Sequence, residues 1–277
     1  MTPTYVLVHG STSNSRSWAP MQRELAFRGH RSLAVDLPGR GAGFSAAYYQ
    51  QNLAVFAAEP SPTADITAAD TIGHVVDTIR RVREHGPVIL VGHSLGGMAI
   101  SGAGNEIPEL IDRIVYIAAI VPVRPATEYL PEYLKGGFLP AVAPLHVGDP
   151  AKQGHVRVNW RGATPDVLFA LKAVVNPEAS DAGWLATMAG NQPDETLGQW
   201  DPGYGTVGAD TWGRIPRTFL KTVDDKACPP AVQDMFIEEG DALTPDNPWD
   251  VRPIRSSHGG FLTNSTEVAD ILAGLGV

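Results

Sequence analysis

Short apolar runs recur along the chain with the length and spacing of strands in an α/β protein. Each run is rich in β-branched or aromatic residues, which favour strands. The runs cover residues 5–8, 32–35, 88–91, 114–119, 217–222 and 251–256. Nearly continuous apolar character predicts strands that are buried on both faces, as in a parallel sheet.

Helical patterns lie between several of these runs. Apolar residues recur three and four positions apart over residues 18–28, 68–84, 95–106, 231–239 and 266–275. Gly29, Gly86 and Gly240 stand where a glycine is expected to end a helix. Alternating strands and helices predict an α/β fold: a mostly parallel sheet of about six strands with helices on both faces.

Residues 122–213 interrupt this alternation. They are rich in Pro and Gly, contain four of the six tryptophans and show no clear strand, although residues 167–175 and 184–189 look helical. We expect an inserted lid, or cap, over the carboxyl edge of the sheet. The core domain then consists of residues 1–121 and 214–277. A separate small domain with its own hydrophobic core is the alternative.

The turn that follows the third predicted strand carries the strongest chemical signal. Its sequence Gly92-His93-Ser94-Leu95-Gly96 matches G-x-S-x-G between a strand and a helix. This is typical of a nucleophile elbow, where small residues allow close backbone approach around an exposed hydroxyl. Ser94 is therefore the candidate nucleophile. An ordinary strand-to-helix turn is the alternative, which partner residues elsewhere in the chain disfavour.

A serine hydroxyl needs a base, and histidine suits that task near neutral pH. His258 lies in a polar turn after the sixth predicted strand, and such turns carry reactive groups in open α/β sheets. Asp224 and Asp225 follow the fifth strand, so the chain order is Ser, acid, His. Adjacent residues leaving a strand point to different sides, so at most one of the two should contact His258.

Negative charge that develops on a substrate carbonyl needs backbone donors. We expect the N–H groups of Ser11, in the glycine turn after the first strand, and of Leu95, at a helix N-terminus, to form an oxyanion hole. His9 most simply braces that turn, with a second catalytic base as the alternative. His93 points away from Ser94 and is expected to be a packing or pocket residue.

Composition and charge exclude several other classes of protein. The chain has 277 residues, of which 43% are hydrophobic and 18% charged, and no apolar run approaches the roughly 18 residues of a membrane span. Its formal charge is −9, with one short basic patch at Arg80, Arg81 and Arg83, so we expect no nucleic-acid partner.

The cysteine count and the lack of targeting, metal-binding and nucleotide-binding motifs further limit the class of protein. The single cysteine, Cys228, excludes an intrachain disulfide, and no targeting pattern precedes the first strand, so we expect a cytoplasmic enzyme. Metal-binding and nucleotide-binding motifs are lacking, so no metal and no cofactor are expected. The expected partner is a small-molecule ester or lactone. The sequence leaves oligomeric state open, a homodimer included.

Together these features resemble the α/β-hydrolase superfamily, in particular the branch of plant hydroxynitrile lyases and methyl-ester (salicylate-binding-like) esterases. The likeness covers most of the chain and is carried by residues 5–10, residues 92–97, Asp225-Lys226 and His258-Gly259-Gly260. It implies that Asp225 is the acid. It also implies that an apolar substrate pocket lies beneath the lid. The candidate lining residues are Gly10, His93, Phe138, Trp160, Trp184 and Met188.

Two positions distinguish reactions within that branch. Hydroxynitrile lyases of one type have a hydroxyl residue directly after the first-strand histidine and a lysine directly after the catalytic histidine, whereas this chain has Gly10 and Gly259. We therefore predict a cofactor-free serine hydrolase that cleaves a small, largely apolar carboxylic ester or lactone through an acyl-enzyme. The alternatives are lyase, cyclase, dehydratase or perhydrolase chemistry on the same scaffold, or a receptor-like slow hydrolase.

Overall fold

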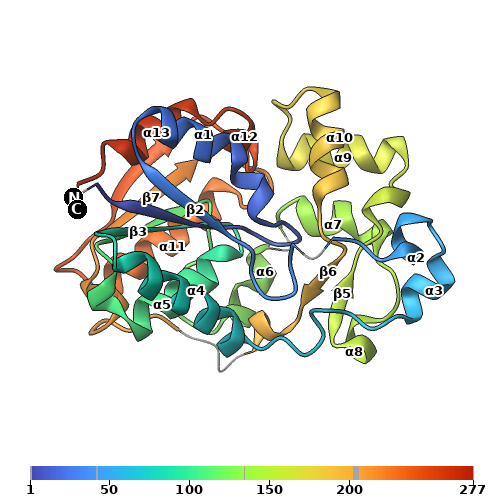
Figure 1. Cartoon of the computed structure of the whole chain (residues 1–277), viewed down its shortest axis with the longest axis horizontal. Helices are drawn as coiled ribbons and strands as arrows, with labels where there is room; N and C mark the ends of the chain where they lie inside the picture. Colours follow the sequence, from blue (N-terminus) through green and yellow to red (C-terminus); the bar gives the residue numbers. More distant parts are fainter. Residues whose placement is uncertain (1, 42, 134, 202–205, 277) are drawn as a thin grey trace.

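A parallel six-stranded sheet forms the centre of the computed structural model, which describes residues 2–41, 43–133, 135–201 and 206–276 (Figure 1). The strand order is β2-β1-β3-β4-β7-β8, and every neighbouring pair is parallel. All six predicted strands are confirmed. Their bounds are β1 Thr4–Val8, β2 Arg31–Val35, β3 Val88–His93, β4 Arg113–Ile117, β7 Arg217–Thr222 and β8 Asp250–Ile254.

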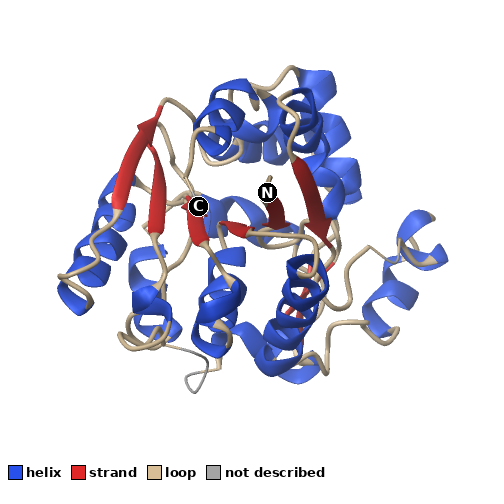
Figure 2. Cartoon of the chain, turned by 60° about the vertical axis from the view of Figure 1, so that its left-hand side comes forward, coloured by secondary structure: helices blue, strands red, loops and turns tan. Residues whose placement is uncertain are grey.

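Helices cover both faces of the sheet, as predicted (Figure 2). Helices α1 (Ala19–Phe27), α12 (Gly260–Thr263) and α13 (Thr266–Ala273) cover one face, and α4 (Ala68–Arg83), α5 (Gly96–Glu106) and α11 (Pro230–Leu243) cover the other. Alternate residues of β1 enter the two cores: Tyr5 and Leu7 pack with the first set, Val6 and Val8 with the second. Burial on both sides explains why this strand is apolar throughout.

Glycines end two helices as predicted, and the third expectation is wrong. Gly29 and Gly86 have φ of 77° and 132°, conformations that suit glycine after a helix. Gly240 instead lies inside α11, which continues to Leu243. A Cβ at Gly240 would lie 2.5 Å from Nε1 of Trp249, so this position requires glycine for packing against the Trp249 side chain rather than for ending the helix.

We call residues 122–213 the insert. Its helices are α6 (Leu130–Tyr133), α7 (Phe138–Val142), α8 (Pro150–Gln153), α9 (Pro165–Val175) and α10 (Asp181–Gly190), and it lies beyond the carboxyl ends of the sheet strands (Figure 1). The two helical segments expected there are confirmed. Two short helices before α4, α2 (Ala46–Tyr49) and α3 (Leu53–Ala58), lie beside it. The lid role and the exact domain boundaries stay predictions.

Among its described residues the insert has no strand in the main sheet, but it contains two short strands that the sequence did not make clear. Strands β5 (His155–Arg157) and β6 (Asp194–Thr196) form a two-stranded antiparallel sheet. Arg157 of β5 donates two hydrogen bonds of 2.7 Å to the carboxylate of Asp194 on β6, and both side chains are buried. Charged residues in three-residue strands give no apolar pattern, and their burial depends on the ion pair that only the folded chain forms.

Candidate active site

Ser94 occupies a sharp turn between β3 and α5. Its φ is 53°, a left-handed conformation that is rare for a residue with a side chain and often marks a functional turn. A Cβ at Gly96 would lie 2.5 Å from the carbonyl oxygen of His9, and one at Gly97 would lie 2.2 Å from that of Ile120. Gly96 and Gly97 thus let the turn pass between the loops that follow β1 and β4.

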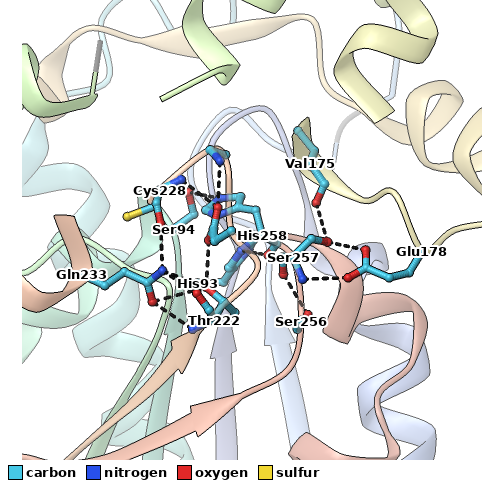
Figure 3. Close-up of polar contacts among 12 residues, drawn as sticks. His93, Ser94, Val175, Glu178, Thr222, Cys228, Gln233, Ser256, Ser257 and His258 are labelled. Atoms are coloured by element: carbon cyan, nitrogen blue, oxygen red, sulfur yellow. Dashed lines mark hydrogen bonds and ion pairs between the residues drawn. The ribbon is translucent and has the colours of Figure 1, made fainter. Parts of the chain in front are cut away.

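A chain of hydrogen bonds joins Ser94, His258 and Asp225. Figure 3 labels Ser94 and His258 in this group. The Nε2 atom of His258 lies 2.9 Å from Oγ of Ser94, and its Nδ1 atom lies 2.8 Å from Oδ2 of Asp225. Since a carboxylate can only accept, Nδ1 carries the proton and Nε2 is left to accept the serine hydroxyl. This arrangement can remove a proton from Ser94 and stabilise the imidazolium that results.

Asp225 is held by four donors, whereas its neighbour Asp224 is exposed. The Oδ1 atom of Asp225 accepts the backbone N–H groups of Ala227 and Cys228, both at 2.8 Å, and Oδ2 accepts Oγ1 of Thr222 at 2.8 Å in addition to the histidine. The side chain is only 3% exposed. Charge-assisted hydrogen bonds therefore orient this carboxylate toward the ring, and of the two adjacent acids only Asp225 contacts it.

A glutamine that the sequence analysis missed supports the acid. Gln233 of α11 is fully buried, donates to the carbonyl oxygens of Thr222 and Cys228 at 3.0 and 2.8 Å, and accepts the N–H of Thr222 at 2.9 Å. It thus ties together the two ends of the turn that carries Asp225. The available signal was its place beside Val232 and Phe236 on the apolar face of a predicted helix, where a polar side chain needs partners.

The loop after β1 lies directly against Ser94. A Cβ at Gly10 would lie 2.8 Å from Cβ and 3.4 Å from Oγ of Ser94. Among the described residues, no hydrogen-bond acceptor is recorded for the backbone N–H groups of Ser11 or Leu95. Leu95 also precedes the first turn of α5, where unpaired amides and the helix dipole favour negative charge. Both predicted oxyanion donors therefore lie on segments adjoining Ser94.

A buried carboxylate of the insert, also missed by the sequence analysis, holds this loop. The Oε2 atom of Glu195 accepts Oγ of Ser11 and the backbone N–H of Thr12, both at 2.8 Å. Its Oε1 atom is paired with the guanidinium of Arg40. A cavity of about 10 Å³, room for one water molecule, is lined by residues including Gly10, Leu95, Arg40 and Glu195.

His9 braces the loop after β1 and does not contact Ser94 in the recorded hydrogen bonds. Its Nδ1 donates to the carbonyl oxygen of Gly10 at 2.8 Å, and its Nε2 accepts the N–H of Leu37 at 3.2 Å. Burial, reinforced by the charge of Arg40, lowers the pKa of His9 to about 4. The imidazole is therefore neutral at pH 7, and both of its nitrogens are occupied by structural hydrogen bonds.

His93 lies behind His258 rather than in front of Ser94. Its Nε2 donates to the carbonyl oxygen of His258 at 3.0 Å, and the two ring centroids are 4.7 Å apart. Trp18 and Phe261 enclose the other sides of the ring. Burial lowers the pKa of His93 well below its usual value, so its imidazole is neutral. This neutral ring packs against the ring of His258 and hydrogen-bonds to its backbone.

Three of the insert residues predicted to line a pocket are packing residues of the insert. Trp160, Trp184 and Met188 are buried in its hydrophobic core, and Phe138 of α7 is half-buried against the same cluster. The indole N–H groups of Trp160 and Trp184 donate to carbonyl oxygens within the insert, both at 2.9 Å. The insert thus has a hydrophobic core of its own, and the lining role of these four residues stays a prediction.

Within the described ranges, no cluster of three or more His, Cys, Asp or Glu residues could hold a metal ion. None of the helices in the same ranges is long and apolar enough to cross a membrane.

A parallel sheet with a serine on the strained turn after β3 and a histidine on the loop after β8 is the architecture of the α/β hydrolases. The chain belongs to the alpha/beta hydrolase family, whose sequence profile matches residues 5–271. The fold class predicted from sequence is thereby confirmed, and the protein is a hydrolase of this family.

Similar proteins include several esterases. Methylesterase 1 of Arabidopsis thaliana is 26% identical over 246 residues, which cover 84% of this chain and 82% of that protein. The pyrethroid hydrolase of Sphingobium wenxiniae is 26% identical over 277 residues, covering 97% of this chain and 85% of that one. The crystal structure of polyneuridine aldehyde esterase shares the fold, with a TM-score of 0.75 over 98% of both chains at 21% identity. The resemblance to methyl-ester esterases is confirmed.

Proposed function

We propose that this protein is a cofactor-free serine hydrolase that cleaves a small, largely apolar carboxylic ester or lactone. The observation that carries the proposal is the unbroken series of hydrogen bonds from Oγ of Ser94 through the ring of His258 to Asp225. A serine, a neutral imidazole and a buried carboxylate in this order form the arrangement that activates a hydroxyl for attack on a carbonyl.

Acylation begins when Oγ of Ser94 attacks the carbonyl carbon while Nε2 of His258 accepts the hydroxyl proton. The Asp225 carboxylate stabilises the imidazolium, and the N–H groups of Ser11 and Leu95 donate to the oxyanion of the tetrahedral intermediate. The bond between carbon and the alcohol oxygen then breaks, and the imidazolium returns its proton to that oxygen. In a lactone the released alcohol remains attached to the acyl group.

Deacylation repeats these steps with water as the nucleophile. His258 removes a proton from water, hydroxide attacks the acyl carbon, and the same proton returns to Ser94 as the acid leaves. The sequence of steps uses only side chains and backbone N–H groups of this chain. No metal or cofactor is needed to balance it.

The substrate class rests on the relatives and on the surroundings of His258. A methylesterase and a pyrethroid hydrolase match most of the chain, and their names refer to the hydrolysis of methyl esters and of pyrethroids. The position after the base also argues for ester hydrolysis over cyanohydrin cleavage. The chain has Gly259 directly after the base and therefore lacks the lysine that hydroxynitrile lyases of one type have there.

Replacement of Ser94 tests the proposal directly. The Ser94→Ala variant should hydrolyse a short-chain aryl ester roughly 10⁴- to 10⁶-fold more slowly than the wild type, because members of a triad act as a unit. An activated organophosphonate should label the wild type on the peptide that contains Ser94, and the variant should remain unlabelled. Full activity in the variant, or a label on another residue, would refute the proposal.

A further inference from the structure

The loop that carries His258 is bonded to the insert on both sides of the histidine. Figure 3 shows the contacts of Ser257, on the side before the histidine. Before it, Ser257 donates its backbone N–H to Oε1 of Glu178 at 2.8 Å and its hydroxyl to Oε2 of the same carboxylate at 2.5 Å. After it, the N–H of Gly259 donates to the carbonyl oxygen of Val175 at 2.7 Å. Both acceptors belong to the segment at the C-terminal end of α9.

These contacts give hydrogen-bond partners to polar groups at the C-terminal end of α9. Val175 is the last residue of α9, and its carbonyl oxygen has no acceptor role within the helix. Asn176, the next residue, is buried and donates to the carbonyl oxygen of Gly259 at 3.2 Å and to Oγ1 of Thr263 at 2.6 Å. The end of α9 is thus joined to the histidine loop by backbone and side-chain hydrogen bonds together.

Glu178 differs from the other acceptors at this junction because it is charged and accepts two hydrogen bonds from one residue. Its carboxylate binds both donors of one residue, which fixes the backbone and the χ1 angle of Ser257 at once, and a charged acceptor makes each bond stronger than a neutral one would. Ser257 is fully buried, and the carboxylate is the recorded acceptor of its backbone N–H, whereas its hydroxyl has a second acceptor in the carbonyl oxygen of Val175 at 3.1 Å. Glu178 itself is exposed, which means that its own burial stabilises the fold little.

We propose that Glu178 is a positioning residue that holds His258 in line with Ser94 and Asp225, so that the base is aligned only when the end of α9 is seated on the histidine loop. The inference rests on the proposed hydrolase function. A displacement of about 1 Å in a reacting group is enough to cost roughly 100-fold in rate. Movement of the insert would break the Ser257 and Gly259 bonds together, and the insert position would therefore control the activity of the triad.

Two substitutions and a matched control test this role. Glu178→Ala removes both acceptors, Glu178→Gln keeps one amide oxygen, and Asp181→Ala removes a nearby insert carboxylate that pairs with Lys172 of α9 and does not contact the histidine loop in the recorded bonds. For Glu178→Ala we expect kcat to fall by about 10- to 100-fold with KM nearly unchanged, by analogy with the loss of residues that orient metal ligands. The Glu178→Gln variant should recover part of this loss, and Asp181→Ala should retain wild-type kinetics.

Measurements on the resting protein distinguish positioning from general loosening of the structure. The rate at which an organophosphonate labels Ser94 should fall by the same factor as kcat in Glu178→Ala, while the melting temperature stays near that of Asp181→Ala. The downfield proton resonance of the His258 Nδ1–H should broaden in Glu178→Ala alone. Wild-type kcat and labelling rate in Glu178→Ala would overturn the proposal, as would equal losses in Glu178→Ala and Asp181→Ala.

Failure of the proposed function has a separate signature. An active Ser94→Ala variant would refute the hydrolase mechanism. Hydrogen exchange would still measure the contacts between the histidine loop and the end of α9. In that case the amides of Ser257 and Gly259 should lose protection in Glu178→Ala whatever reaction the protein performs. Unchanged protection at both amides would overturn the structural basis of the inference.

Discussion

The carboxylate of Glu195 accepts the backbone N–H of Thr12 at 2.8 Å, although the two residues are 183 positions apart in the chain. Thr12 has φ of 54°, an unfavourable conformation for a residue with a branched Cβ, so the bond holds a strained turn. The same oxygen atom accepts the hydroxyl of Ser11, one of the two proposed oxyanion donors. The insert thus shapes the loop that faces Ser94.

Removal of the charge on Glu195 should destabilise the protein strongly. The side chains of Arg40 and Glu195 are 4% and 7% exposed, and loss of one partner leaves an uncompensated buried charge. We expect Glu195→Gln to lower the free energy of unfolding by about 3–5 kcal/mol in urea denaturation. The double variant Arg40→Met/Glu195→Gln should lose less than the single one, and a larger loss in the double variant would contradict the electrostatic explanation.

The two adjacent aspartates should behave very differently. Asp225→Asn keeps the shape of the side chain but offers an N–H group to His258, which disfavours the tautomer that accepts from Ser94. We expect kcat to fall by about 10⁴-fold, as for the equivalent change in the well-studied serine protease triad. Asp224→Asn, at an exposed position, is the control and should keep wild-type activity. Comparable losses in the two variants would exclude the assignment of Asp225 as the acid.

A single methyl group at Gly10 should disrupt the site. The added Cβ would lie 2.8 Å from that of Ser94, closer than such atoms approach, so one of the two segments must move. A shift of this kind predicts that Gly10→Ala reduces kcat by roughly 100-fold. Gly73→Ala is the matched control, because nothing lies within 4 Å of its added Cβ on α4. Normal kinetics in Gly10→Ala would show that the loop tolerates displacement.

Stability should fall as the pH is lowered from 6.5 towards 4. The pKa of His9 is about 4 in the folded protein, below the 6.5 of an exposed histidine, so the unfolded chain binds more protons in this window. The contribution is fully present above pH 6.5, and the pKa difference corresponds to a loss of roughly 3 kcal/mol by pH 4. Burial of His93 acts in the same direction.

Urea denaturation at a series of pH values measures this slope. In His9→Asn, which cannot titrate, the decrease between pH 6.5 and 4 should be clearly smaller than in the wild type. The exposed His74 provides the control, and His74→Asn should keep the wild-type slope. A His9→Asn slope equal to that of the wild type would rule out His9 as the source.

Local patterns predicted the residues that meet at the centre of the site. The elbow around Ser94 needs glycines within a few positions of one serine, and strand ends before Asp225 and His258 place both side chains at one edge of the sheet. The residues at which helices end were harder to predict from the sequence than the residues of the site. The glycine that packs against Trp249 has the same appearance in the sequence as one that ends a helix.

The amino-acid order was thus sufficient for the parallel sheet, the turn at Ser94 and the candidate triad, because each depends on neighbours along the chain or on the rule that parallel strands share one carboxyl edge. Folding alone brought Glu195 to Thr12 and Glu178 to Ser257. These carboxylates lie in segments without distinctive periodicity, and their roles arise from donors 183 and 79 residues away. Hydrogen bonds of that kind leave no local pattern, since either partner by itself is typical of a solvated polar residue.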